Sequence, residues 1–258
     1  MTHTGSRVAV VTGGLAGIGL AIAQKLSACG MTVAIGARRG GDSDYQAMAR
    51  DKVAPGTLVR HLDVCDEASV DRFCRTVREE CGPIDVLVNA AGVTHHHTVS
   101  GHGTKDWTDC IDTNLTGPFL MIRACLPQMM ERGWGRIVNI ASTAARAAVA
   151  DHPAYCASKA GLVGLTRAVA LEGAPHGVSC VSVSPTWVET EMLRNSAAIM
   201  ASQTGRSAQE EIAAIAASNP QNRLVQPEEV AAVVALACSD DAPSLTMEDI
   251  SVNAGAHW

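Results

Sequence analysis

Residues 8–19 read VAVVTGGLAGIG, in which a short β-branched run leads directly into a glycine-rich turn. Apolar residues then recur at helical spacing over residues 17–29, so this part of the chain predicts a strand, a tight turn and a helix. Glycines in such a turn permit positive φ angles and let backbone N–H groups approach a phosphate, while the helix N-terminus adds partial positive charge. The spacing T-G-x-x-x-G-x-G differs from the common G-x-G-x-x-G, and any tight turn between strand and helix could look similar. Its position at the first strand favours phosphate binding.

The alternation of strand-like and helix-like segments continues along the chain. Further strands are predicted at residues 31–37, 84–89, 135–141 and 178–184, and the last three are continuous and apolar enough to be buried on both faces. This pattern predicts an α/β fold with a doubly wound, Rossmann-like parallel sheet in one domain spanning residues 1–258. Functional residues are then expected at the carboxyl ends of the strands.

Residues 186–219 break this rhythm, because they contain no strand-like run and many small residues. A connection of this length in a compact domain is usually functional, and it directly follows a strand end. We therefore predict a helical substrate lid here. The alternative is a pair of ordinary surface helices.

The composition limits the classes of partner. The chain has 258 residues and a formal net charge of -6, with acidic and basic residues interspersed, which argues against nucleic acid as a partner. Its nine cysteines form no C-x-x-C pair and are expected to be small buried hydrophobes in a reducing compartment rather than metal ligands. No apolar run approaches the roughly 20 residues of a membrane span. We expect a cytoplasmic protein with no metal and no membrane association.

Two further strand ends suit a bound nucleotide. Asp63 follows a strand-like pair and can accept a hydrogen bond from an adenine amino group. The turn Asn89-Ala90-Ala91-Gly92 ends a buried strand, where small residues let a ribose lie against the backbone. Each of these features alone would be interpreted as an ordinary turn.

The end of the second strand bears on the choice of cofactor. Arg38 and Arg39 follow it, where an NAD-selective site usually carries an acid for the ribose 2′-hydroxyl. Two guanidinium groups suit a 2′-phosphate, so we predict NADP(H), with Arg38 as the leading contact. A solvated arginine pair is the alternative, and the nearby Asp42 and Asp44 keep NAD(H) open.

Tyr155 and Lys159 are four residues apart, so on a helix they lie on the same face, one turn apart. An ordinary phenol has a pKa of about 10, too high for ready proton exchange at neutral pH. We expect the lysine ammonium, and the positive ring of an oxidised nicotinamide, to lower the pKa of Tyr155. Tyr155 can then act as general acid or base on a carbonyl or alcohol.

Two more residues support this chemistry. Ser142 ends a predicted strand, where its hydroxyl can hydrogen-bond the reacting oxygen. Asn114 lies inside a predicted helix, a locally unfavourable place for asparagine, and its amide could bind a water that connects to Lys159.

With these residues together, the chain resembles the short-chain dehydrogenase/reductase family in its single-domain form, over essentially its whole length. The matching motifs are T-G-x-x-x-G-I-G from Thr12, N-A-A-G from Asn89, Asn114, I-V-N-I-A-S ending at Ser142, Y-C-A-S-K from Tyr155, and the late helix start P-E-E-V-A from Pro227.

The resemblance implies hydride transfer between a nicotinamide and a carbonyl carbon. It implies catalytic Asn114, Ser142, Tyr155 and Lys159, with Lys159 also holding the nicotinamide ribose and residues 185–190 meeting the nicotinamide amide. The predicted cofactor-binding set is Thr12, Gly13, Gly17, Ile18, Gly19, Arg38, Arg39, Asp63, Val64, Asn89, Ala90, Gly92, Tyr155, Lys159, Pro185, Val188 and Thr190.

The chain departs from the family at two places. The family usually has Pro-Gly where this chain has Pro185-Thr186, and Asp-Gly-Gly where it has Asn253-Ala254-Gly255. We expect both departures to tune substrate or subunit contacts without abolishing catalysis.

Some features are weaker guides. The run His95-His96-His97 does not suit one metal ion, because adjacent side chains of an extended segment point to opposite faces. We expect one of them to line the entrance and the others to be solvated. The helix over residues 153–174 is apolar on most faces, which predicts packing on the sheet and on a second subunit of a homotetramer or homodimer.

The substrate is the least determined part of the prediction. The chain looks most similar to 3-oxoacyl-thioester reductases and polyketide ketoreductases, so a 3-oxoacyl thioester or small ketone is expected. Arg132, Arg136 and His176 are expected beside the active site, but this set is modest for an acidic carrier protein, which favours a small molecule or acyl-CoA. The alternatives are an NAD-dependent secondary-alcohol dehydrogenase and a non-redox nucleotide-binding relative.

Overall fold

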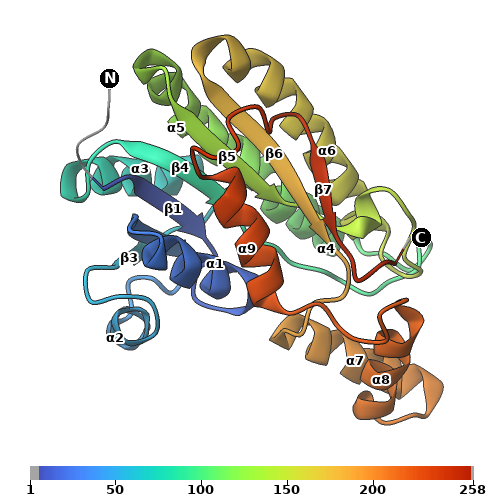
Figure 1. Cartoon of the computed structure of the whole chain (residues 1–258). Coiled ribbons are helices and arrows are strands. Elements are labelled where there is room, and N and C mark those ends of the chain that lie inside the picture. The colour runs from blue at the N-terminus through green and yellow to red at the C-terminus, as the bar shows by residue number, and fades with distance from the viewer. Residues whose placement is uncertain (1–5, 257–258) are drawn as a thin grey trace.

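The computed structural model describes residues 6–256 and consists of a parallel sheet with helices on both faces (Figure 1). Its strands are β1 (Val8–Thr12), β2 (Thr32–Ala37), β3 (Leu58–His61), β4 (Ile84–Asn89), β5 (Gly135–Ile140), β6 (Val178–Pro185) and β7 (Asp249–Val252). Its α-helices are α1 (Gly17–Ala28), α2 (Ser43–Lys52), α3 (Glu67–Glu80), α4 (Thr104–Ile111), α5 (Gly117–Arg132), α6 (Pro153–Gly173), α7 (Glu191–Thr204), α8 (Ala208–Ser218) and α9 (Pro227–Ala237).

The strand order is β3-β2-β1-β4-β5-β6-β7, and every pair of neighbours is parallel. The order therefore reverses between β1 and β4, where an open α/β sheet forms its ligand crevice. Thr12 pairs in register with Asn89, and Asn89 with Asn139, so the carboxyl ends of β1, β4 and β5 meet along one edge. The predicted α/β fold with a doubly wound parallel sheet is confirmed.

Two hydrophobic layers hold the sheet between the helices. One contains Ile22 of α1 and Val234 of α9, and these two helices lie in front of the sheet in Figure 1. The other contains Phe73 of α3, Met121 of α5 and Val169 of α6. Burial of β1, β4, β5 and β6 on both faces explains why these strands read as continuous apolar runs.

The predicted strands lie within one or two residues of the observed ones, as is usual for element ends. Neither edge strand, β3 (Leu58–His61) nor β7 (Asp249–Val252), was predicted, because each has only four residues, is partly polar and is only partly buried. Five of the nine cysteines (Cys74, Cys110, Cys125, Cys180 and Cys238) are buried as expected, whereas Cys29 and Cys65 are exposed.

The segment over residues 186–219 folds into α7 and α8, which project below the sheet in Figure 1. Thr190 caps α7 by accepting a hydrogen bond from Leu193 N, and Ser207 with Glu210 forms a capping box on α8. An isolated parallel bridge between Val188 and Val225 joins the chain just before α7 to the chain just before α9.

Candidate active site

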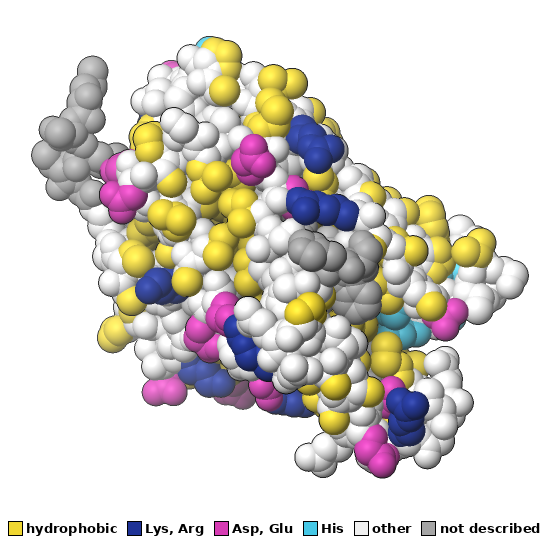
Figure 2. Space-filling model, turned by 45° about the vertical axis from the view of Figure 1, so that its right-hand side comes forward, with side chains coloured by type: hydrophobic (Ala, Val, Ile, Leu, Met, Phe, Trp, Pro, Cys, Tyr) yellow, Lys and Arg dark blue, Asp and Glu magenta, His cyan; other side chains and the backbone are white. Residues whose placement is uncertain are grey.

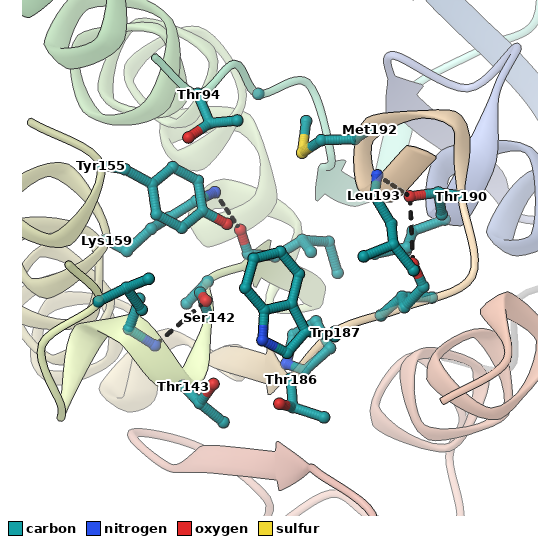
Figure 3. Close-up of a pocket in the computed structure, with 18 of the residues that line it drawn as sticks. Thr94, Ser142, Thr143, Tyr155, Lys159, Thr186, Trp187, Thr190, Met192 and Leu193 are labelled. Carbon is teal, nitrogen blue, oxygen red and sulfur yellow. Dashed lines mark hydrogen bonds between the residues drawn. The ribbon is translucent and has the colours of Figure 1, made fainter. Parts of the chain in front are cut away.

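A cavity opens at the carboxyl ends of the strands, between the sheet and α7. Its wall contains Ser142, Tyr155 and Lys159, together with Pro185 and Thr190 from the segment after β6. Figure 3 shows Ser142, Tyr155, Lys159 and Thr190 around one space, with Trp187 and Met192 opposite Tyr155. Three of the four predicted catalytic residues therefore line a common site.

Tyr155 and Lys159 lie on successive turns at the start of α6. The Lys159 Nζ is 5.6 Å from the centre of the Tyr155 ring and donates a 2.7 Å hydrogen bond to Ile140 O. Lys159 is only 5% exposed, so its charge depends on this carbonyl rather than on water. The hydrogen bond fixes the ammonium between the helix and the end of β5.

Within the chain itself, Lys159 does not lower the pKa of Tyr155 as expected. Removal of the phenol from water raises its pKa to about 12, against the smaller lowering effect of a hydrogen bond with Ser142. Burial also lowers the pKa of Lys159 to about 8. The phenol therefore keeps its proton at neutral pH and is ready to donate it.

Asn114 lies behind the cavity rather than in its wall. It occupies a π-helical stretch, Asp112–Thr116, between α4 and α5, and is fully buried. Its Oδ1 accepts from Val93 N at 2.9 Å, and its Nδ2 donates to Val93 O at 2.9 Å and to Ser158 Oγ at 3.1 Å. Asn114 thus ties the turn after β4 to α6, and the predicted water beside Lys159 remains a prediction.

Ser142 directly follows β5 and begins a short 3-10 turn, Thr143–Ala145. Its Oγ accepts a 3.2 Å hydrogen bond from Ala144 N, and the residue is 8% exposed. The hydroxyl proton remains for Tyr155 or for an oxygen that enters the cavity.

A second cavity extends over the glycine turn and the end of β2. Its wall contains Gly92, which also lines the first cavity, and five more of the predicted nucleotide contacts, so the two cavities are neighbours on either side of Gly92. The five contacts are Gly13, Arg38, Arg39, Asp63 and Val64. Of the remaining predicted contacts, Ile18, Ala90, Val188 and Thr190 line the first cavity, whereas Thr12, Gly17, Gly19 and Asn89 line neither.

The glycine turn needs its glycines for steric reasons. Gly13 has φ +67°, and a Cβ there would lie 3.0 Å from Ala91 Cα. A Cβ on Gly19 would lie 2.4 Å from Gly13 O, which no packed side chain allows. Thr12 Oγ1 accepts from both Ala90 N and Ala91 N at 3.1 Å, so the turn after β4 rests on the turn after β1. Together these contacts leave a cradle with open backbone, which fits a nucleotide phosphate.

The two predicted arginines differ in their surroundings. Arg39 pairs with Asp42 at 3.0 Å and stacks over Tyr45 at 4.1 Å. The guanidinium of Arg38 is exposed and has no hydrogen bond or ion pair within residues 6–256. Arg38 is therefore the guanidinium that can bind an anion without losing a protein partner.

Asp63 and Asn89 mainly organise their own turns. Asp63 Oδ1 accepts from Cys65 N at 3.0 Å, which fixes the turn after β3. Asn89 is buried and donates from Nδ2 to Asn139 Oδ1 at 2.8 Å. Asp63 still lines the second cavity, but Asn89 has a structural place within the sheet.

The cavity also contains residues that sequence reasoning missed. His152 and Thr94 line it, and the histidine is 4% exposed. The signal for His152 was its place directly before Pro153, which starts α6 two residues before Tyr155. Thr186, the departure from Pro-Gly, is buried in the wall, and its hydroxyl has no partner within the described chain, so it can bind a polar atom of a ligand.

The second departure forms a strained turn. Ala254 adopts φ +49°, a conformation that favours glycine, and its carbonyl accepts from Gln221 N at 3.2 Å. The turn therefore contacts the chain just beyond α8.

The three adjacent histidines each have a different partner. His95 Nε2 lies 2.7 Å from Asp109 and His97 Nε2 lies 3.0 Å from Asp106, so neither is simply solvated as expected. His96 lies 3.0 Å from Ser196 of α7, and burial lowers its pKa to about 4. Figure 2 shows imidazole side chains at the notch between the body and the lower lobe formed by α7 and α8.

The expected basic set beside the active site is wrong. Arg132 donates to Ile84 O, and Arg136 is the second residue of β5, so both lie at the amino ends of the strands. His176 lies just before β6 at the same end. In a parallel sheet the residues before the strands lie opposite the ligand edge. On the face seen in Figure 2, basic and acidic side chains are dispersed.

Residues 7–200 match the sequence profile described as short chain dehydrogenase. The chain belongs to the short-chain dehydrogenase family. It is 38% identical to the acetoacetyl-CoA reductase of Rhizobium meliloti (strain 1021), covering 98% of this chain and 99% of that protein. It is 34% identical to the 3-oxoacyl-[acyl-carrier-protein] reductase of Vibrio harveyi, covering 97% of both.

A solved member of the short-chain dehydrogenase family has the same fold. The crystal structure of a single-residue variant of the actinorhodin polyketide ketoreductase with NADPH superposes with a TM-score of 0.92, at 37% identity and 97% coverage of both chains. This chain is accordingly an NAD(P)-dependent oxidoreductase of the short-chain dehydrogenase family. Within residues 6–256 no helix is long and apolar enough to cross a bilayer.

Proposed function

We propose that this enzyme reduces the ketone of a 3-oxoacyl thioester, as its coenzyme A ester or a similar small molecule, with NADPH. The observation that carries the proposal is that Tyr155, Ser142 and Lys159 line one cavity, which shares Gly92 with the wall of the second cavity at the glycine turn. An acetoacetyl-CoA reductase and a 3-oxoacyl reductase among the relatives support this substrate class.

Tyr155 is the proposed proton donor. Burial keeps its phenol protonated, so it can donate to the carbonyl oxygen as that oxygen gains negative charge. Ser142 donates a second hydrogen bond to the same oxygen and orients the carbonyl. Lys159, held by Ile140 O, then stabilises the phenolate left on Tyr155.

The residues proposed to bind the cofactor have the space and the charge that an NADP nucleotide requires. The bound cofactor supplies the hydride that reaches the carbonyl carbon. The turn at Gly13 leaves room for its phosphates, Arg38 offers a free guanidinium for the 2′-phosphate, and Pro185, Val188 and Thr190 adjoin the catalytic cavity where the nicotinamide is expected. The unpartnered Thr186 hydroxyl suits a carbonyl of the thioester or of the cofactor amide.

Free coenzyme A esters suit the site better than an acidic carrier protein. The three basic residues considered for carrier binding lie at the opposite end of the sheet from the cavity: Arg132, Arg136 and His176. They therefore provide no positive charge beside the cavity for an acidic carrier protein. The cavity wall is mostly apolar, with Trp187, Met192 and Val149, which suits a short acyl chain.

The test measures oxidation of NADPH and of NADH by the purified enzyme with acetoacetyl-CoA, with an aryl ketone and without substrate. Faster oxidation of NADPH with the thioester is expected. Turnover with NADH alone would favour the NAD-dependent alcohol dehydrogenase. Undiminished turnover by the Tyr155→Phe variant would exclude the proposed proton donor. Binding of NADPH without turnover of any ketone tested would favour the non-redox relative.

A further inference from the structure

The edge strand β7 carries a buried carboxylate that the proposed chemistry does not use. The side chain of Asp249 is only 2% exposed. Its Oδ1 accepts hydrogen bonds from Ser182 Oγ at 2.7 Å and Ser184 Oγ at 2.6 Å, both on β6. Its Oδ2 accepts from Arg146 Nε at 2.7 Å. A carboxylate this buried is stable only with such partners.

All three guanidinium nitrogens of Arg146 donate hydrogen bonds to β7. Besides Nε, its Nη1 donates to Ser251 Oγ at 3.1 Å and its Nη2 donates to Asp249 O. Arg146 follows the 3-10 turn that Ser142 begins, and its backbone N donates to Thr143 O at 3.0 Å. The turn is therefore held by the Ser142 hydroxyl at one end and by Arg146 at the other.

The same carboxylate also holds the segment after β6. Ser184 immediately precedes Pro185, which pairs in register with Val252 of β7. Thr186 N donates to Val252 O at 3.2 Å, directly beyond that pair. Asp249 thus contacts two neighbours of the catalytic cavity: the turn that carries Ser142 and the strand end that leads into residues 185–190.

We propose that the Arg146–Asp249 pair is a positioning device that sets the distance between these two walls of the cavity. The inference rests on the proposed function, in which one wall holds the substrate carbonyl and the other the nicotinamide. Hydride transfer requires reacting atoms in near contact, and a displacement of about 1 Å can cost roughly 100-fold in rate. Neither residue touches the substrate, so the expected effect is on kcat rather than on binding.

The experiment compares Arg146→Ala, Arg146→Lys and the double variant Arg146→Ala/Asp249→Asn with the wild-type enzyme. Arg146→Ala is expected to lower kcat roughly 10- to 100-fold with the KM values of ketone and NADPH within about twofold. Its deuterium isotope effect with 4-deuterated NADPH should rise, because hydride transfer becomes more rate-limiting. Arg146→Lys, which keeps the charge but not the three-donor fork, should recover part of kcat. The double variant leaves no unpaired buried carboxylate, so it should regain stability while the loss of kcat persists.

Arg7→Ala is the matched control, because Arg7 binds both carboxylate oxygens of Asp240 at 2.9 and 2.7 Å, at the amino end of β1. It should leave kcat and the isotope effect unchanged. A fall in activity that only follows the folded fraction, or a rise in KM alone, would overturn the proposal. So would an Arg146→Lys variant no better than Arg146→Ala.

Hydrogen–deuterium exchange tests the link without turnover. In the Arg146→Lys variant, amides of residues 143–147 and 186–190 should exchange faster, while those of α1 should not. Unchanged exchange in both segments would overturn the positioning role. If the wild-type enzyme reduces no thioester but the exchange changes as expected, the proposed function fails while the mechanical link stands.

Discussion

The side chain on which the proposed chemistry depends most is Tyr155. Replacement by Phe removes one hydroxyl and leaves the ring in the cavity wall. We expect kcat for thioester reduction to fall about 10²- to 10⁴-fold, the range for loss of a general acid, with little change in the affinity for NADPH. Steady-state kinetics and cofactor titration by fluorescence measure the two quantities. A parallel loss of NADPH affinity would mean that the hydroxyl contributes to cofactor binding rather than to proton transfer alone.

The pH dependence of kcat/KM for ketone reduction should report the ionisation of Lys159. Its pKa in the folded chain is lowered from 10.5 to about 8, so the charged form is lost as pH rises through about 8. The Tyr155 phenol keeps its proton until about pH 12. We therefore expect kcat/KM for reduction to fall above about pH 8. The Lys159→Met variant should have a low activity without this descending limb, and a limb that persists in it would assign the titration to another group.

The choice between the two dinucleotides is predicted to depend on Arg38. Arg38→Ala should raise the KM for NADPH roughly 10- to 100-fold, because hydrogen bonds to charged groups contribute about 1.5–3 kcal/mol, and leave the KM for NADH nearly unchanged. Arg39→Ala is the neighbouring control, and its effect should be smaller because Asp42 and Tyr45 already engage that guanidinium. Equal effects on both dinucleotides would contradict a 2′-phosphate contact.

At the scale of the element, the turn between β1 and α1 has no space for a side chain at Gly19. Gly19→Ala places a Cβ 2.4 Å from Gly13 O, so the turn must open. We expect a higher KM for NADPH and a fall in unfolding temperature of more than roughly 2–4 °C, the shift that about 1 kcal/mol gives in a chain of this size. Gly41→Ala meets nothing within 4 Å and serves as the control. An unchanged KM would place the nucleotide phosphates elsewhere.

The elements also show where sequence reasoning reached its limit. β1, β4, β5 and β6 could be predicted because burial on both faces leaves an uninterrupted apolar run. β7 could not, because Asp249 owes its burial to Ser182, Ser184 and Arg146, which are far away in the sequence. The raised pKa of Tyr155 could not be predicted for a similar reason. The spacing to Lys159 predicts that the two side chains share a helix face, but it does not predict the desolvation that has the largest effect on the pKa of the phenol. His152 had only its place before Pro153 as a signal, and its position in the cavity wall shows only in the structure.

At the scale of the whole molecule, α6 exposes a narrow face of small and apolar residues. Leu171 is 66% exposed, and Ala168 and Gly164 lie on the same face one and two turns earlier, respectively. We expect this face to pack on a second copy of the chain. Wild-type protein should elute as a dimer or tetramer in size-exclusion chromatography with light scattering.

Leu171→Glu should shift that distribution toward smaller species, because it replaces about 1.5–3 kcal/mol of burial with a desolvated charge in each subunit. Leu236→Glu, at a similarly exposed leucine on α9, is the control for a change of surface charge. A wild-type monomer at micromolar concentration would refute this interface.

The bridge between Val188 and Val225 has a consequence for how such an enzyme can change over evolutionary time. The backbone contact between Val188 and Val225 holds the two flanks of the α7–α8 segment together beside the sheet. This one contact therefore offsets much of the conformational entropy that is lost when the loop closes. Changes in the first turns of α7, where Met192, Leu193 and Ser196 line the cavity, can then alter its shape while Val188 and Val225 keep the ends of the segment in place. Substitutions in the α7–α8 segment can therefore change the substrate specificity while the sheet and the proposed proton donor, Tyr155, stay the same.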